Sequence, residues 1–147
     1  MSYLYAMDIR KITAKFFAAP QISPADLPQI AEAGIKRVLC NRPDEEIPQS
    51  HHASVMADAA RTAGLEFVIL PLTHQNMTLD VIAENKSLMA ACEGPVLAYC
   101  ASGTRSTIAW AIGMASEMNV DDIIEAARQG GYDLRNLRPT LEAAARL

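Results

Sequence analysis

The sequence predicts a single α/β domain, in which a mostly parallel sheet of four to five strands carries helices on both faces. Strand-like and helix-like stretches alternate along the 147 residues, and this alternation implies crossover helices between parallel strands. The apolar run PVLAYC, residues 95–100, is typical of a strand that is buried on both faces. We expect residues 1–6 to be a loose N-terminal extension and residues 7–147 to form the domain.

Five stretches have the length and the β-branched or aromatic content of strands. LEFVILPL is the most β-like of them, and PVLAYC is the most continuously apolar. In chain order, we expect strands over residues 9–13, 16–19, 35–41, 65–72 and 95–100.

Helix start and stop signals lie between and after these strands. In the first expected helix, Ser23 is predicted to be the N-cap, Pro24 to occupy the first helical position and Gly34 to follow the last turn. Ser50 and Asp121 are expected to cap later helices in the same way. In chain order, we expect helices over residues 23–34, 50–63, 78–92, 105–118, 122–129 and 139–147.

The composition argues against several classes of protein. The net charge of -4 disfavours nucleic-acid binding, which needs a basic face. No apolar run approaches the roughly 20 residues that span a membrane, and no signal-peptide pattern opens the chain. Cys40, Cys92 and Cys100 form no CxxC pair and no cluster with zinc spacing. We expect a cytoplasmic protein with reduced thiols, no membrane or nucleic-acid partner, no bound metal and no required cofactor.

Three strand ends are expected to lie around one crevice. In parallel α/β sheets, ligands bind beyond the carboxyl ends of the strands. The predicted ends at Cys40, Leu72 and Cys100 therefore bring together loops that are far apart in the chain.

The sequence CASGTRS, which begins at Cys100, has the composition of an anion cradle. The N–H groups of residues 101–105 can converge on an anion, and the helix N-terminus adds partial positive charge. Gly103 permits a backbone conformation that a Cβ would hinder, and Arg105 offers a bidentate contact to an oxyanion. The same field favours the nucleophilic thiolate of Cys100, and we expect Ser106 to donate to its sulfur. The simpler interpretation is that Cys100 is a small buried hydrophobe.

Several motifs resemble the bacterial beta-lactamase-hydrolase-like phosphatase domain family, whose members are relatives of the tyrosine and dual-specificity phosphatases. The resemblance covers nearly the whole chain. It rests on PQISPADLPQIAEAGIKRVLCNRPDEE, AARTAGLEFVILPLT, GPVLAYCASGTRST and GYDLRNLRPTLE. It implies a tyrosine-phosphatase-like fold, with Cys100 as the nucleophile and Arg105 as the residue that binds the oxyanion.

The cysteine loop departs from the phosphatase signature in two places. That signature has five residues between cysteine and arginine and usually a histidine before the cysteine, whereas Tyr99 precedes Cys100 here. The four residues between Cys100 and Arg105 are Ala101, Ser102, Gly103 and Thr104. Four is the spacing of rhodanese-type sulfurtransferases, whose loop surrounds a cysteine persulfide, and some relatives of the family are labelled sulfur transferases.

The general acid of a phosphatase is not evident in the sequence. Dual-specificity relatives carry an aspartate on the loop that corresponds to THQNM here, where Thr73 or His74 stands instead. His74 is one candidate because histidine side chains titrate near neutral pH, and the other is Asp44 in the loop NRPDEE. Arg42 either helps to bind the anion or pairs with the neighbouring acids. The alternative for His74 and Asp44 is an ordinary role in solvated loops.

Cys40 ends a strand that we expect to neighbour the strand of Cys100. It is either a buried core residue or a thiol that traps oxidised Cys100 as a disulfide. The simpler core role is the favoured one, and the sequence does not decide between them.

Three functions follow from these observations. The first is a cysteine-dependent, phosphatase-like hydrolase of a small anionic phosphate ester or phosphorylated molecule. The second is a sulfurtransferase that works through a Cys100 persulfide. The third is a catalytically silent module that binds oxyanions. The sequence names neither the substrate nor the oligomeric state.

Overall fold

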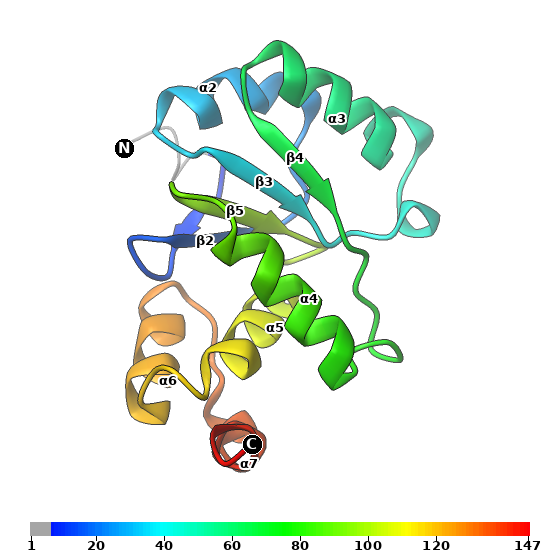
Figure 1. The fold of residues 1–147 in the computed structure, drawn as a ribbon. Helices are drawn as coiled ribbons and strands as arrows, with labels where there is room; N and C mark the ends of the chain where they lie inside the picture. Colours follow the sequence, from blue (N-terminus) through cyan, green and yellow to red (C-terminus); the bar gives the residue numbers. More distant parts are fainter. Residues whose placement is uncertain (1–6) are drawn as a thin grey trace.

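A computed structural model describes residues 7–147, so the expected extension over residues 1–6 lies outside the described residues. The described chain forms a five-stranded sheet with the order β1-β2-β5-β3-β4 (Figure 1). Only β1 runs antiparallel to its neighbour, so the predicted α/β class with a mostly parallel sheet is confirmed. The strands are β1 (Arg10–Lys11), β2 (Phe16–Ala19), β3 (Arg37–Cys40), β4 (Glu66–Ile69) and β5 (Val96–Tyr99).

Helices cover both faces of the sheet, as predicted. Figure 1 shows α2 and α3 on one face and α4 to α7 on the other. The helices are α2 (Leu27–Glu32), α3 (Ala53–Thr62), α4 (Leu79–Ala90), α5 (Thr104–Met114), α6 (Val120–Gln129) and α7 (Arg138–Ala145). Short 3-10 turns span Pro24–Asp26, Asp44–Glu46, Gln49–His51 and Arg135–Leu137. No helix within residues 7–147 is long and apolar enough to cross a membrane.

The strand β5 lies in the middle of the sheet and explains its continuously apolar sequence. Its side chains alternate between the two faces, and all four are buried. Leu97 and Tyr99 belong to the core under α2 and α3, whereas Val96 and Ala98 belong to the core under α4 to α7. Because both faces of this strand are buried, apolar residues are favoured at every position and do not alternate with polar ones.

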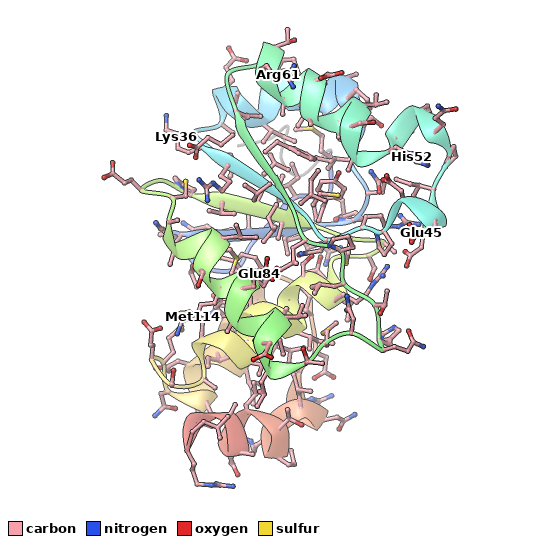
Figure 2. The ribbon with its side chains drawn as sticks, turned by 45° about the vertical axis from the view of Figure 1, so that its right-hand side comes forward. Lys36, Glu45, His52, Arg61, Glu84 and Met114 are labelled. Atoms are coloured by element: carbon pink, nitrogen blue, oxygen red, sulfur yellow. The ribbon has the colours of Figure 1, made fainter. Side chains whose placement is uncertain are left out.

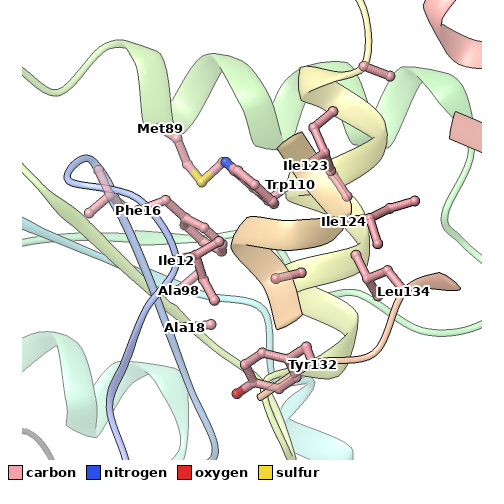
Figure 3. Packing of buried hydrophobic residues seen from close by; sticks show 14 of the residues in the cluster. Ile12, Phe16, Ala18, Met89, Ala98, Trp110, Ile123, Ile124, Tyr132 and Leu134 are labelled. Carbon is pink, nitrogen blue, oxygen red and sulfur yellow. The ribbon is translucent and has the colours of Figure 1, made fainter. Parts of the chain in front are cut away.

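The core under α4 to α7 is centred on aromatic side chains (Figure 3). The rings of Phe16 and Trp110 stack with centroids 5.1 Å apart and planes 12° apart. Phe16 comes from β2 and Trp110 from α5, so this contact fixes the helix that follows the cysteine loop against the sheet.

Two predicted helix caps are wrong. The helix α3 begins at Ala53 rather than after Ser50. Its first N–H, that of Ala53, donates to Asp44 Oδ1 at 2.8 Å. Ser50 instead contacts the ring nitrogen of the adjacent His51. In α6 the cap is Asn119, whose side-chain oxygen accepts from the Asp121 N–H at 2.8 Å.

The predicted strand over residues 65–72 is too long. Pairing within the sheet ends at Ile69, although the N–H groups of Leu70 and Leu72 still bond to the carbonyls of Cys40 and Asn41. Pro71 has no N–H to donate, so the regular ladder stops where the chain turns toward the crevice.

The double burial of β5 predicts a large loss of stability when one of its core side chains is shortened. Leu97→Ala is expected to lower the free energy of unfolding by about 2–5 kcal/mol, because it removes a fully buried side chain and leaves a cavity. Urea unfolding followed by circular dichroism measures the change. The same substitution at Leu79, which is 60% exposed, is the matched control and is expected to cost about 0.5 kcal/mol or less. Equal losses at both positions would contradict the described burial.

Candidate active site

The predicted strand ends meet at the carboxyl edge of the sheet, and the region around Cys100 and Arg105 at this edge is named the crevice. β5 lies between β2 and β3, so the loop after Cys100 is flanked by the segments that follow those two strands. The Asn41 N–H bonds to the Tyr99 carbonyl, and the Gln21 N–H bonds to the Ala101 carbonyl. Three segments that are distant in sequence thus meet around the cysteine loop.

The loop itself folds back over the Cys100 sulfur. Gly103 adopts φ +94°, which side chains with a Cβ rarely adopt, and its N–H points to Cys100 Sγ at 3.2 Å. Cys100 is fully buried, whereas Ala101, Ser102 and Thr104 are exposed. The loop therefore places a backbone donor on a sulfur that lies below its surface.

Thr104 starts α5, so the loop after Cys100 leads directly into a helix N-terminus. The Ser102 hydroxyl bonds to Thr104 Oγ1 at 2.9 Å, and the Thr107 hydroxyl donates to the Gly103 carbonyl at 2.8 Å. The positive end of the helix dipole adds to the local field that favours an anion at the loop.

Arg105 is the best-anchored side chain of the site. Its Nη1 and Nη2 atoms donate to the two carboxylate oxygens of Glu46 at 2.8 and 2.7 Å, and Nη1 also donates to the Leu72 carbonyl at 2.7 Å. These bonds all leave from the Nη atoms, and the nearby Cys100 side chain contributes, after Glu46, to the raised pKa of Arg105. The Nε–Nη2 edge of the guanidinium therefore keeps a donor for a ligand oxygen.

Glu46 holds both arginines of the crevice. Besides its two contacts with Arg105, Glu46 Oε1 accepts from Arg42 Nε at 2.8 Å. Arg42 also reaches Gln21 at 3.4 Å and the Glu46 carbonyl at 3.2 Å. The bonds from Arg105 lower the pKa of Glu46, and the same pair raises the pKa of Arg105. Glu46 is thus an ionised counter-ion under ordinary conditions.

Glu46 was not predicted to be a site residue. It is one of the acids near Arg42 that were expected only as possible partners of that arginine. A signal was present, because the acidic run DEE directly follows a predicted strand end at the crevice. The sequence did not indicate which of the acids turns inward, and Figure 2 shows the neighbouring Glu45 on this segment.

The two predicted general acids lie in different settings. Asp44 accepts the Ala53 N–H at the start of α3, and its other oxygen lies 3.9 Å from His52 Nδ1. Asp44 thus stabilises a helix terminus. His74 is exposed on the loop between β4 and α4, two residues after the carbonyl of Leu72 that binds Arg105.

Ser106 differs from its expected role. Its hydroxyl donates to Asn41 Oδ1 at 2.8 Å rather than to Cys100 Sγ, and a hydroxyl has one proton to donate. Asn41 in turn donates to Asn85 Oδ1 and to the Leu70 carbonyl, both at 2.9 Å. All three side chains are buried, so Ser106 belongs to a network that fastens α5 to α4 and to the end of β3.

Cys40 lies in the strand next to β5, as expected, paired in register with Tyr99. It is buried in the core under α2 and α3, and burial raises the pKa of its thiol. Cys40, Cys92 and Cys100 are all free thiols. Trapping of oxidised Cys100 by Cys40 stays a prediction.

The His, Cys, Asp and Glu side chains of the described part of the chain form no group of three or more that could hold a metal ion. The polar groups at the crevice are instead two arginines, one carboxylate and the loop amides. This arrangement is suited to an oxyanion, with a thiol directly below it.

Comparisons with known proteins agree with this fold. Residues 8–117 match the family model of the beta-lactamase hydrolase-like protein, phosphatase-like domain. A beta-lactamase hydrolase-like protein of Agrobacterium fabrum strain C58 is 30% identical over 126 residues, which are 84% of this chain and 29% of that protein. Two relatives from Xylella fastidiosa are matched over 33% and 30% of their lengths. The chain thus spans about a third of the curated relatives it matches.

Solved structures share the architecture. A provisionally named phosphatase from Neisseria meningitidis Z2491 is 35% identical, with a TM-score of 0.82 over 94% of this chain and 99% of that chain. The active form of Tk-PTP has a TM-score of 0.65 at 16% identity, over 94% of this chain and 95% of that chain, and therefore shows a tyrosine-phosphatase-like fold alone. The chain belongs to the phosphatase-like domain family of the beta-lactamase hydrolase-like proteins.

Proposed function

We propose that this protein hydrolyses a phosphate monoester through the thiolate of Cys100. The observation that carries the proposal is the Gly103 N–H, which donates to Cys100 Sγ at 3.2 Å inside a loop that also presents Arg105. This N–H is a donor from which the sulfur accepts in the attacking form that the reaction requires. Membership in a phosphatase-like family supports the same reaction.

The reaction has two displacements at phosphorus. The Cys100 thiolate forms a bond to phosphorus while the bond to the ester oxygen breaks, and that oxygen takes a proton from a general acid. Water then attacks the phosphocysteine and gives up its proton to the conjugate base. The sulfur leaves as a thiolate and inorganic phosphate is released.

Arg105 and the loop amides hold the transferred group. We assign the Nε–Nη2 edge of Arg105 to two of the phosphoryl oxygens, since the opposite edge is bound to Glu46. Glu46 is a positioning residue in this scheme. Its lowered pKa keeps it ionised, so it is a poor proton donor near neutral pH.

His74 is the general acid that we propose. It stands on the loop between β4 and α4, in which the Leu72 carbonyl is bound to Arg105, and its side chain is exposed. Asp44 is less suited, because one of its oxygens is occupied by the Ala53 N–H.

Sulfur transfer is the second candidate. It is favoured by the four-residue spacing of the loop and by the engagement of Asp44 in a helix cap. In this reaction the Cys100 thiolate attacks the outer sulfur of thiosulfate, an S–S bond forms, and sulfite leaves. An acceptor thiolate then takes the outer sulfur of the Cys100 persulfide and frees the Cys100 thiolate. Neither step needs a strong acid, because the leaving groups are already stable anions.

A side-by-side assay of wild type and Cys100→Ser distinguishes the candidates. We expect wild type to release phosphate from an aryl phosphate and Cys100→Ser to show only background release, because the substituted hydroxyl is a far weaker nucleophile. The second arm measures sulfite release from thiosulfate with a thiol acceptor. Turnover in that arm alone would replace the phosphatase proposal by sulfur transfer, and anion binding without turnover in either arm would indicate a binding module.

His74→Gln tests the proposed acid. We expect the rate of aryl phosphate hydrolysis with a poor leaving group to fall about a hundredfold, the lower range for loss of a general acid. A substrate whose leaving group needs no proton should be hydrolysed almost as fast as by wild type. Asp44→Asn is the matched comparison, and we expect it to lower stability without slowing poor leaving groups selectively. The reverse pattern would assign the acid to Asp44.

Glu46→Gln tests the anchoring of Arg105. The neutral amide weakens the contact with the guanidinium, and we expect kcat/KM to fall about tenfold through loss of Arg105 alignment. Glu45→Gln on the exposed neighbour is the control and should leave kcat/KM unchanged.

The stability of this pair depends on pH in a defined direction. Because Arg105 holds the pKa of Glu46 below its usual range, the pairing stabilises the fold above the pKa of an unfolded glutamate. That contribution is lost as the pH falls through the lowered pKa of the folded state. Urea unfolding of wild type and Glu46→Gln should therefore differ at neutral pH and converge on acidification; a difference that does not shrink would contradict the assignment.

A further inference from the structure

We propose that Tyr132 clamps the nucleophile loop and keeps its carbonyls out of the anion cradle. Tyr132 is a positioning residue here, because it contacts the loop backbone rather than a substrate. The proposal takes the catalytic use of Cys100 from the proposed function, but the clamp is a property of the loop and is measured without turnover.

The clamp is a hydrogen bond from the Tyr132 side chain to the backbone of the loop. Tyr132 follows α6 and is 7% exposed, and its hydroxyl donates to the Ser102 carbonyl at 3.0 Å. Figure 3 shows the ring at the edge of the core under α4 to α7, with the hydroxyl pointing away from Leu134. Burial raises the pKa of Tyr132 to about 12, so the phenol keeps the proton that it donates.

The ring also covers the residue that donates to the sulfur. A Cβ added at Gly103 would lie 2.0 Å from Tyr132 Oη and 2.8 Å from Cζ, so the phenol packs directly on this glycine. Gly103 thus meets two constraints, a positive φ and the close approach of an aromatic ring. Its N–H is held on the Cys100 side while the ring occupies the other side.

Arg10 packs on the ring of Tyr132 and supports its position. The Arg10 guanidinium lies over the Tyr132 ring with Cζ 5.5 Å from the centroid, and its Nη1 donates to the Gly130 carbonyl at 3.1 Å. Asp8 accepts from Arg10 Nε at 2.9 Å. The contacts therefore connect β1 through Tyr132 to the loop. In the sheet order, β1 lies on one side of β5, and β3, which Glu46 follows, lies on the other.

The bond to Ser102 has an electrostatic consequence. A short loop between β5 and α5 has few amides to offer an anion, and a carbonyl turned inward would repel it. Binding the Ser102 carbonyl to the Tyr132 hydroxyl prevents that turn, while the Gly103 N–H stays directed at the sulfur. Cys100 lies under this loop with an exposed fraction of 0%.

This burial makes the clamp measurable. A thiol with no exposed surface reacts with a small alkylating agent only from locally opened states, so its rate follows the opening equilibrium. We expect Tyr132→Phe, which keeps the ring and removes the hydroxyl, to raise the rate of Cys100 alkylation by iodoacetamide about fivefold, the effect of one lost hydrogen bond. Mass spectrometry of peptides reports the rates at Cys40 and Cys92 in the same sample, and these are expected to stay unchanged.

The other two buried cysteines distinguish a local clamp from general stability. If all three thiols react faster by the same factor, Tyr132 only stabilises the whole fold and the proposal is wrong. An unchanged rate at Cys100 would also overturn it. Tyr99→Phe is the matched control, because the buried Tyr99 hydroxyl has no hydrogen-bond partner within residues 7–147, and it should leave the Cys100 rate unchanged.

The experiment also separates this proposal from the proposed function. Alkylation requires no substrate, so a selective rise at Cys100 would support the clamp even if both activity assays were silent. Conversely, activity that depends on Cys100, together with an unselective response to Tyr132→Phe, would preserve the function and remove the clamp.

Discussion

A nearly buried arginine organises the crevice. Arg105 is 9% exposed, and a cation in such a place must be paired and hydrogen-bonded or it would destabilise the fold. Glu46 supplies the charge and the Leu72 carbonyl supplies a further acceptor. The segment after β3, the segment after β4 and the start of α5 are therefore held together by one guanidinium. The position of each loop at the crevice depends on that pairing.

The site offers few hydrogen-bond donors to the buried sulfur. The loop is short, one amide donates to Cys100 Sγ, and the serine next to Arg105 is committed to Asn41. In the reaction that we propose, electrostatic stabilisation by Arg105 and the helix N-terminus therefore carries more of the task than proton transfer does. Either proposed reaction, phosphoryl or sulfur transfer, would then favour a substrate with a good leaving group.

Much of the fold could be predicted because the relevant signals are local. The apolar run of β5, the glycine that follows the first helix and the start of the helix at Thr78 each depend on a few adjacent residues. The structure has β5 at the apolar run, Gly34 with a positive φ after α2, and Thr78 as the N-cap of α4. The caps of α3 and α6 could not be assigned reliably, because several polar residues compete for each terminus and tertiary contacts decide among them. For α3 the accepting group, Asp44, lies nine residues away across a loop.

The site was predictable only in part for a related reason. Cys100 and Arg105 are separated by only four residues, so their loop was recognisable, whereas their partners come from elsewhere in the chain. Glu46 is 59 residues from Arg105, and Tyr132 is 30 residues from Ser102. The inward turn of one acid among three, and the direction of a serine hydroxyl, follow from packing that no single motif encodes.

The carboxylate shared by the two arginines has a consequence for competition among anions. Arg42, Arg105 and Glu46 together carry one net positive charge instead of two. A crevice with two free arginines would hold the inorganic phosphate and sulfate that surround any protein in a cell. With its own counter-ion in place, the crevice attracts free anions less strongly than two unpaired arginines would. An anion that binds there must therefore also gain energy from directed hydrogen bonds, which net charge alone does not supply.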